Sequence, residues 1–207
     1  MQIQRFGRIA AASVVAALMF SYSASSKAVE TADAVAARNG VTIPETALKG
    51  EKYSLRLHHL HTGESIDVIY RIGDTYLPSA MAKLNYFLRD HRTNDVSHYD
   101  PKEFDLLHSV MARLGRPEGV IDIVCGYRTP WSNNFLRTRS ASTGVAKKSQ
   151  HMEAKAIDIR VPGVGTSHLR EIAESFHAGG VGYYPVSQFV HVDVGPVRTW
   201  AFGGHGD

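Results

Sequence analysis

Two short segments of this sequence hold residue types that bind metal ions. The first, KKSQHMEAKAIDIRVPG at residues 147–163, contains His151 and Asp158, and the second, FVHVDVGP at 189–196, contains His191. Zn²⁺ accepts histidine and carboxylate ligands, and a catalytic zinc site uses three protein ligands and keeps one position open. The spacing therefore raises the hypothesis that these three residues hold one metal ion. In the alternative, His151 is a loop residue and Asp158 pairs with a Lys or Arg.

The strands expected around these residues turn their polar side chains to one face. Successive strand residues point to opposite faces, so Asp158 in AIDIRV faces away from its isoleucine neighbours. The same alternation places His191 and Asp193 on one face of FVHVDVG. Two adjacent strands with polar faces toward one cleft would bring Asp158 and His191 together. His151 lies an odd number of residues from Asp158, so it must come from a loop or turn before the strand.

The rest of the sequence predicts helices packed on a small antiparallel sheet, which is an α+β domain. Alternating apolar residues predict hairpins, and apolar residues at helical spacing predict helices. The expected elements are a hairpin at 53–77, helices at 77–92, 100–119 and 166–180, a short helix at 131–140, strands at 120–130 and 155–163, a second hairpin at 180–195 and a Gly-rich tail at 197–207.

The N-terminus has the composition of a secretory signal peptide. Two arginines precede an apolar run from Ile9 to Phe20, and small residues follow. The run is shorter than the roughly 20 residues that span a bilayer. We therefore expect a signal peptide at 1–28, a linker at 29–50 and an exported domain at 51–207, periplasmic or in the cell envelope, with no membrane span after signal removal. An uncleaved N-terminal anchor is the alternative.

Charge and cysteine content restrict the function further. The formal net charge of +3 is too small to indicate nucleic-acid binding, and no block rich in Lys and Arg supports it. Cys125 is the single cysteine, so no intramolecular disulfide can form. We expect it to be a small buried hydrophobic residue at the end of a strand. His58, His59 and His61 are expected to be exposed hairpin residues.

Several segments together resemble one family. SQHMEAKAIDIR resembles the S-x-H-x-x-G-x-A-x-D motif of the M15-type, D-alanyl-D-alanine carboxypeptidase-like zinc peptidases. Their wider group includes lysostaphin-like enzymes and the Hedgehog signalling domain. Five further segments look like the DUF882 branch, which includes murein endopeptidases, and the similarity covers roughly residues 50–200. These segments are LHTGES, FLRDHRT, CGYRTP, GGVGYYP and FVHVDVGPVRTW.

The resemblance implies a Hedgehog/DD-peptidase-like zinc peptidase fold. It implies that His151, Asp158 and His191 bind Zn²⁺. Arg128, in GYR, matches the arginine that faces the reacting carbonyl in this family, and Ser149 matches the serine of the motif. Both are therefore expected to contact substrate.

Two positions depart from the family pattern. Ala154 stands where the motif has glycine. Gln188 stands where related carboxypeptidases place a catalytic glutamate three residues before the last ligand, and an amide cannot act as a base. Asp193 shares a strand face with His191 and is therefore the candidate general base. Its alternative role is to orient a ligand histidine.

The predicted function is that of an exported zinc peptidase acting on peptidoglycan peptides. We expect an endopeptidase that cuts murein peptide cross-links by metal-assisted amide hydrolysis. One alternative is a D,D- or L,D-carboxypeptidase on wall peptides, which needs a pocket for a free carboxylate. The other is a non-catalytic zinc-binding wall module, against which the retained ligands and Arg128 argue.

Overall fold

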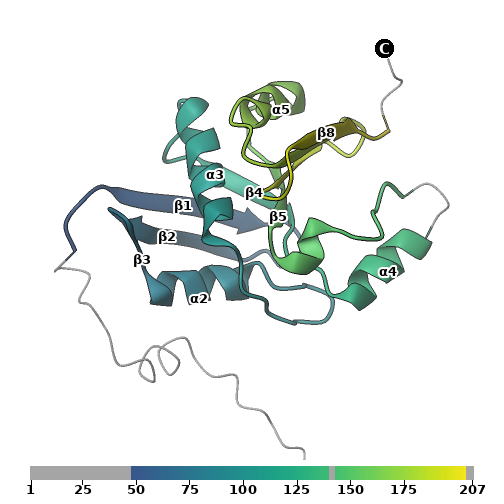
Figure 1. Ribbon diagram of the computed structural model, residues 1–207, viewed down its shortest axis with the longest axis horizontal. Coiled ribbons are helices and arrows are strands. Elements are labelled where there is room, and N and C mark those ends of the chain that lie inside the picture. The colour runs from purple at the N-terminus through teal and green to yellow at the C-terminus, as the bar shows by residue number, and fades with distance from the viewer. Residues whose placement is uncertain (1–47, 140–142, 204–207) are drawn as a thin grey trace, which may run out of the picture.

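A single mixed sheet organises the part of the chain that the computed structural model describes, residues 48–139 and 143–203. The strand order is β3-β2-β1-β4-β5-β7-β6-β8 (Figure 1). The strands are β1 (Lys52–His59), β2 (Ser65–Ile72), β3 (Thr75–Tyr76), β4 (Val120–Cys125), β5 (Ala156–Arg160), β6 (Gly180–Tyr184), β7 (Phe189–Asp193) and β8 (Arg198–Ala201).

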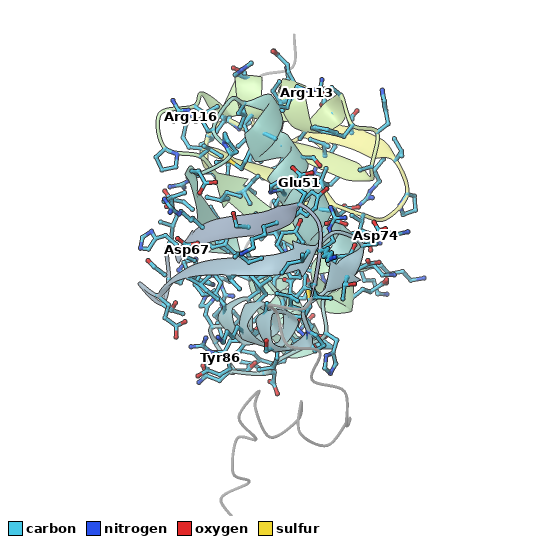
Figure 2. The ribbon with its side chains drawn as sticks, turned by 90° about the vertical axis from the view of Figure 1, so that its left-hand side faces the viewer. Glu51, Asp67, Asp74, Tyr86, Arg113 and Arg116 are labelled. Atoms are coloured by element: carbon cyan, nitrogen blue, oxygen red, sulfur yellow. The ribbon has the colours of Figure 1, made fainter. Side chains whose placement is uncertain are left out.

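Helices cover both faces of the sheet. The helices α3 and α5 contact each other on one side, and α2 lies on the other (Figure 1). Figure 2 shows the same layers from the β1–β2 end, with Arg113 and Arg116 beyond one face and Tyr86 beyond the other. The helices are α2 (Pro78–Phe87), α3 (Pro101–Arg113), α4 (Pro130–Thr138), α5 (Thr166–Glu174) and the 3₁₀ helix η2 (Gln150–Glu153).

The α+β class is confirmed, but the expectation of a small, antiparallel sheet was wrong. β1 pairs with β4 in parallel, and so does β6 with β8, whereas the remaining pairs are antiparallel. A parallel pair needs a crossover connection, and α2 and α3 lie in the connection between β1 and β4. Sequence alternation reports which face of a strand is apolar, and it does not report which strands are neighbours.

Local signals place the elements that carry the polar residues. Asp100 caps α3, because its carboxylate accepts a hydrogen bond from the backbone N–H of Lys102 at 3.1 Å. Ile157 and Ile159 of β5 are fully buried on the face opposite Asp158. This buried apolar face anchors β5 in the core and leaves its other face free to carry polar groups.

The segment expected to be a tail forms the edge strand β8. It pairs in parallel with β6, and Trp200 lies beside Gly182 in the register. A Cβ atom built on Gly182 would come within 2.5 Å of the Trp200 indole, so the indole occupies the space that a side chain would need. Gly182 is in turn the cross-strand partner of His191 on β7. The edge strand therefore brings an aromatic ring next to a predicted metal ligand.

One histidine differs from its expected exposure. His59 is fully buried at the end of β1, where its ring centroid lies 5.9 Å from that of Phe87 in α2. Its Nδ1 accepts hydrogen bonds from the backbone N–H groups of His61 and Thr62. The expectation of an exposed hairpin residue was wrong for His59, because it continues the buried face of β1 that also carries Leu55 and Leu57.

The expected signal peptide and most of the expected linker lie outside the described residues. Within the described ranges, no helix has the length and apolar character needed to cross a membrane.

Candidate metal centre

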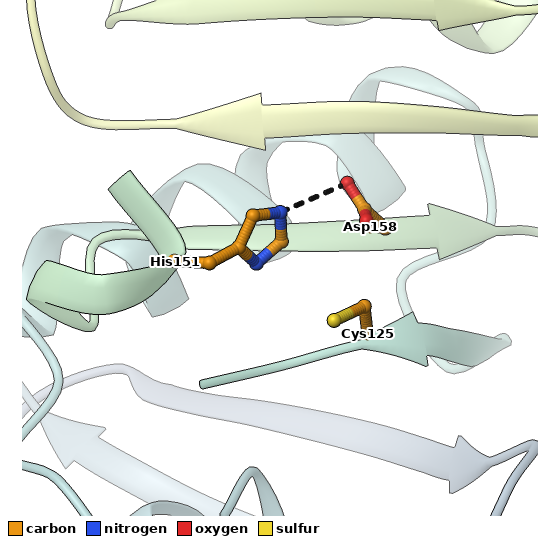
Figure 3. Close-up of side chains that lie close together, drawn as sticks. All are labelled: Cys125, His151 and Asp158. Atoms are coloured by element: carbon orange, nitrogen blue, oxygen red, sulfur yellow. Dashed lines mark hydrogen bonds and ion pairs between the residues drawn. The ribbon is translucent and has the colours of Figure 1, made fainter. Parts of the chain in front are cut away.

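Three predicted ligands meet at one point of the sheet. Asp158 on β5 and His191 on β7 are cross-strand partners, as the alternation predicted, and His151 comes from η2, which precedes β5. The Oδ1 atom of Asp158 lies 2.9 Å from His191 Nδ1 and 3.2 Å from His151 Nε2. The two ring nitrogens are 3.1 Å apart. Figure 3 shows His151 turned toward Asp158.

The hydrogen bonds on the far side of each ring set the tautomers. His151 Nδ1 lies 2.8 Å from the carbonyl oxygen of Gly126, which can only accept, so Nδ1 carries the hydrogen. His191 Nε2 lies 2.9 Å from a carboxylate oxygen of Asp193, so Nε2 carries the hydrogen there. In the neutral form of each ring, the nitrogens that face each other are therefore unprotonated. In that form two nitrogen lone pairs and a carboxylate oxygen converge, which is an arrangement that a cation stabilises.

The donor set fits zinc. Nitrogen and oxygen ligands at about 2.0–2.1 Å in a tetrahedron lie roughly 3.3 Å from one another, close to the separations found here. Burial, reinforced by the charge of Arg128, lowers the pKa of His151 to about 4, so its neutral, metal-binding form predominates at neutral pH. Burial acts to raise the pKa of Asp158, but His151 and His191 hold it well below its usual range. The carboxylate is therefore ionised.

Cys125 offers a competing third donor. A β-bulge between Ile123 and Cys125 makes Cys125 the cross-strand partner of Asp158. Its thiol, His151 and Asp158 have potential ligand atoms within 4.8 Å of one another (Figure 3). Burial raises the pKa of Cys125 to about 12, and the protonated thiol is the form that does not bind metal. His191 Nδ1 lies 2.9 Å from Asp158 Oδ1 and 3.1 Å from His151 Nε2, and it needs no thiol deprotonation, so it is the better third ligand.

Asp193 lies behind His191, on the side away from the other two donors. Its Oδ2 accepts from His191 Nε2, and Arg198 pairs with both carboxylate oxygens at 2.8 and 3.2 Å. Backbone N–H groups of Gly180 and Gly195 donate to Oδ1 at 3.0 and 2.8 Å. The side chain is fully buried. This geometry favours the orienting role over the role of general base, because the carboxylate contacts the far nitrogen of His191, Arg198 and two backbone N–H groups, and not the nitrogen that faces the other donors.

Arg128 and Ser149 lie on the opposite side of the cluster. The Arg128 backbone N–H donates to the carbonyl of His151 at 3.2 Å, and Nη2 donates to Ser149 Oγ at 3.1 Å. Arg128 is 8% exposed and lines a cleft together with His191. A fixed guanidinium beside the donor cluster can stabilise negative charge that develops on a carbonyl oxygen.

The segment FLRDHRT holds this side of the site in place. Residues 126–129 make the contacts to His151 described above. They donate hydrogen bonds to two acceptors in FLRDHRT. Asp90 Oδ2 accepts from the backbone N–H and the hydroxyl of Thr129 at 2.8 and 2.9 Å, and the carbonyl of Leu88 accepts from Tyr127 N–H at 2.8 Å. Asp90 is fully buried, so these bonds are shielded from water. The hydrogen-bond network around Asp90 therefore supports the site.

The two departures from the family motif have clear positions. Ala154 ends η2 with φ 51° and ψ 45°, the left-handed conformation that glycine adopts without strain, so alanine costs ~1–2 kcal/mol there. Gln188 lies exposed in the turn between β6 and β7, and its side-chain amide donates to the carbonyl of Pro185. Neither the chemistry nor the placement of Gln188 suits a base. Glu153 is also exposed and pairs with Lys155.

A cleft of about 870 Å³ opens beside the donor cluster. Among the described residues, no Asp or Glu lines it. The lining residues are Arg128, Arg137, Thr143, Gly144, Val145, Ala146, Lys147, Lys148, Ser149, Gln150, Tyr184, His191, Arg198, Trp200 and Phe202.

Three converging donors beside a cleft, on an α+β fold, are typical of a metal-dependent hydrolase. A family model described as "Peptidoglycan L,D-endopeptidase MepK", of the M15 peptidases, matches residues 47–200. The chain belongs to this family.

Curated relatives carry the same description. Peptidoglycan L,D-endopeptidase MepK of Escherichia coli (strain K12) is 47% identical over 146 residues, which is 70% of this chain and 79% of the relative. Probable peptidoglycan L,D-endopeptidase MepK of Haemophilus influenzae is 43% identical over 146 residues, which is 70% of this chain and 77% of the relative. No solved structure gave a significant match.

Proposed function

We propose that this protein is a zinc-dependent peptidoglycan endopeptidase that cuts peptide cross-links of the bacterial wall. The observation that carries the proposal is the convergence of His151 Nε2, Asp158 Oδ1 and His191 Nδ1 beside a cleft. The family membership and the names of the relatives support the substrate class. We also propose that residues 51–207 adopt the Hedgehog/DD-peptidase-like zinc peptidase fold.

Each group around the cluster has a separate part in the proposed reaction. Zn²⁺, when bound by the three donors, supplies Lewis acidity for amide hydrolysis. Arg128 stabilises the oxyanion that forms on the scissile carbonyl, and Ser149 fixes its guanidinium. Gly126 and Asp193 hold the two histidines in the tautomers that leave the facing nitrogens unprotonated.

The location of the substrate agrees with the proposed destination of the chain. We propose that residues 1–28 are a signal peptide, that 29–50 are a linker and that the mature protein acts in the periplasm or cell envelope. The order of arginines, apolar run and small residues supports this.

Digestion of purified cross-linked muropeptides tests the function. Wild-type protein should convert cross-linked dimers into monomers, each cleavage adding one water, as mass spectrometry of the products would record. A zinc chelator should stop the reaction and added Zn²⁺ should restore it. Release of a single terminal residue would instead indicate a carboxypeptidase. Binding of wall fragments with no cleavage would indicate the non-catalytic module.

The variant Asp193→Asn separates the two roles of Asp193. Asparagine keeps an oxygen that can accept from His191 Nε2 but loses the charge and the pairing with Arg198. We expect zinc affinity to fall ~10–100-fold and saturating zinc to restore turnover to within a few-fold of wild type.

Turnover of Asp193→Asn, measured as a function of zinc concentration, distinguishes the two roles. Asp67→Asn, an exposed carboxylate of β2 that pairs with Arg56, is the matched control and should behave like wild type. If turnover of Asp193→Asn stays ~10²–10⁴-fold low at saturating zinc, Asp193 is the general base and the orienting role is wrong.

A further inference from the structure

The cleft beside the donor cluster has an unusual charge. Five of its lining residues are Lys or Arg, and no acidic residue lines it among the described part of the chain. The whole sequence is almost balanced, with 23 Lys and Arg against 20 Asp and Glu. The cationic lining is therefore a local feature and not a consequence of overall composition. A cleft lined by one sign of charge concentrates ligands of the opposite sign.

Three of these cations form what we call the cationic wall: Arg137 at the end of α4, Lys147 and Lys148. All three are exposed, and none forms an ion pair with a described residue. Among the described residues, Arg137 donates only to the neutral side chain of Asn134, at 3.1 Å. In contrast, Arg198, which also lines the cleft, is neutralised by Asp193. The charge of the cationic wall is therefore available to a ligand.

The loop that carries the two lysines has a defined place next to the donor cluster. Asn133 Nδ2 donates to the carbonyl of Ala146 at 3.0 Å, which ties the loop to α4. A Cβ atom on Gly144 would come within 2.9 Å of the Phe202 ring, so the loop also meets the C-terminal side of the cleft. Lys148 precedes His151 by three residues, so their Cα atoms lie within about 11 Å.

Aromatic residues also line the cleft. Trp200 lies over Gly182, with its ring centroid 5.0 Å from that of His191, and its indole N–H donates to the hydroxyl of Tyr184 at 3.0 Å. A ligand in this cleft therefore meets both cations and aromatic rings. A short peptide with free carboxylates and aliphatic carbons fits both kinds of lining residue.

We propose that the cationic wall selects anionic wall peptides, by binding free carboxylates that flank the scissile amide. This inference rests on the proposed endopeptidase function and adds a substrate class to it. Peptides in which the same carboxylates are amidated should be poorer substrates, because a carboxamide gives up the charge that Lys147 and Lys148 attract. Ion pairs at exposed positions are individually weak and screened by salt, so the preference should fall as ionic strength rises.

The test compares two cross-linked peptides. They differ only next to the cut bond, where one has free carboxylates and the other has carboxamides. For wild type at low salt, kcat/KM should be roughly 5- to 20-fold higher for the free acid, as expected of two or three exposed ion pairs. The double variant Lys147→Gln/Lys148→Gln should lose most of this preference through a higher KM for the acid, with kcat little changed. Lys52→Gln/Lys102→Gln, which removes two exposed lysines outside the cleft lining, is the control for charge.

A binding measurement tests the inference independently of the proposed endopeptidase function. Equilibrium binding of both peptides to the inactive variant His191→Ala should show the same preference for the acid, and its loss when the two lysines are also replaced. Equal cleavage of acid and amide by wild type would overturn the inference and leave the endopeptidase intact. Cleavage of neither peptide would count against the proposed function, and the binding measurement would still decide the inference. A preference that survives in the double variant would overturn the role of these lysines.

Discussion

Replacing His151, Asp158 or His191 by alanine should remove the bound metal and the activity together. Their donor atoms lie 2.9 to 3.2 Å apart, so each variant leaves two donors where a catalytic zinc site needs three. The loss of metal affinity should exceed the ~10–100-fold typical of residues that only orient a ligand. Elemental analysis of protein prepared without a histidine tag should give about one zinc per chain for wild type and far less for each variant.

Cys125 supplies the matched control. It shares the neighbourhood of His151 and Asp158 but is expected to remain a protonated thiol. Cys125→Ala should therefore keep both zinc and activity. The opposite pattern, with zinc lost from Cys125→Ala and kept in His191→Ala, would replace His191 by Cys125 in the ligand set. Circular dichroism should show native helix content in every variant, because none of the replaced side chains belongs to the apolar cluster that forms the core.

The sequence predicted well those parts of the site that depend on strand alternation. Asp158 and His191 each interrupt an apolar strand, and the period of two along β5 and β7 is a local property that a sequence displays directly. His151 was placed off the strand by the same counting, and η2 fulfils this expectation. The apolar residues on the other face of these strands had to be buried, so their alternation identified the core as well.

Features that depend on contacts between distant segments could not be predicted in this way. The bulge that turns Cys125 toward Asp158 has no local signal in VIDIVCG. The bonds from Asp90 to Thr129 join segments far apart in the sequence. β8 is a short edge strand whose pairing with β6 depends on tertiary structure. Gly182 of β6 leaves room for the Trp200 indole, but a glycine in a sequence does not show which group lies over it.

Arg128→Ala should lower turnover by ~10²–10³-fold while the metal stays bound, which is the usual cost of removing one donor that stabilises an oxyanion. Arg128 is 8% exposed and its guanidinium donates to Ser149, so its position beside the donor cluster is fixed before substrate binds. It contributes no ligand atom to the cluster, which is why zinc content should remain near that of wild type. Arg128→Lys should recover only part of the loss, because an ammonium group retains the charge without the planar geometry.

Zinc content and kcat/KM, measured on the same preparations, give the result for Arg128. Ser149→Ala removes only the hydroxyl that holds the guanidinium, and its loss of turnover should therefore be smaller than that of Arg128→Ala. Near-normal turnover of Arg128→Ala at normal zinc content would show that the oxyanion is stabilised by another group. A loss of zinc in parallel with activity would show that the Arg128 side chain acts by keeping the donor cluster in place, and not by contacting the substrate.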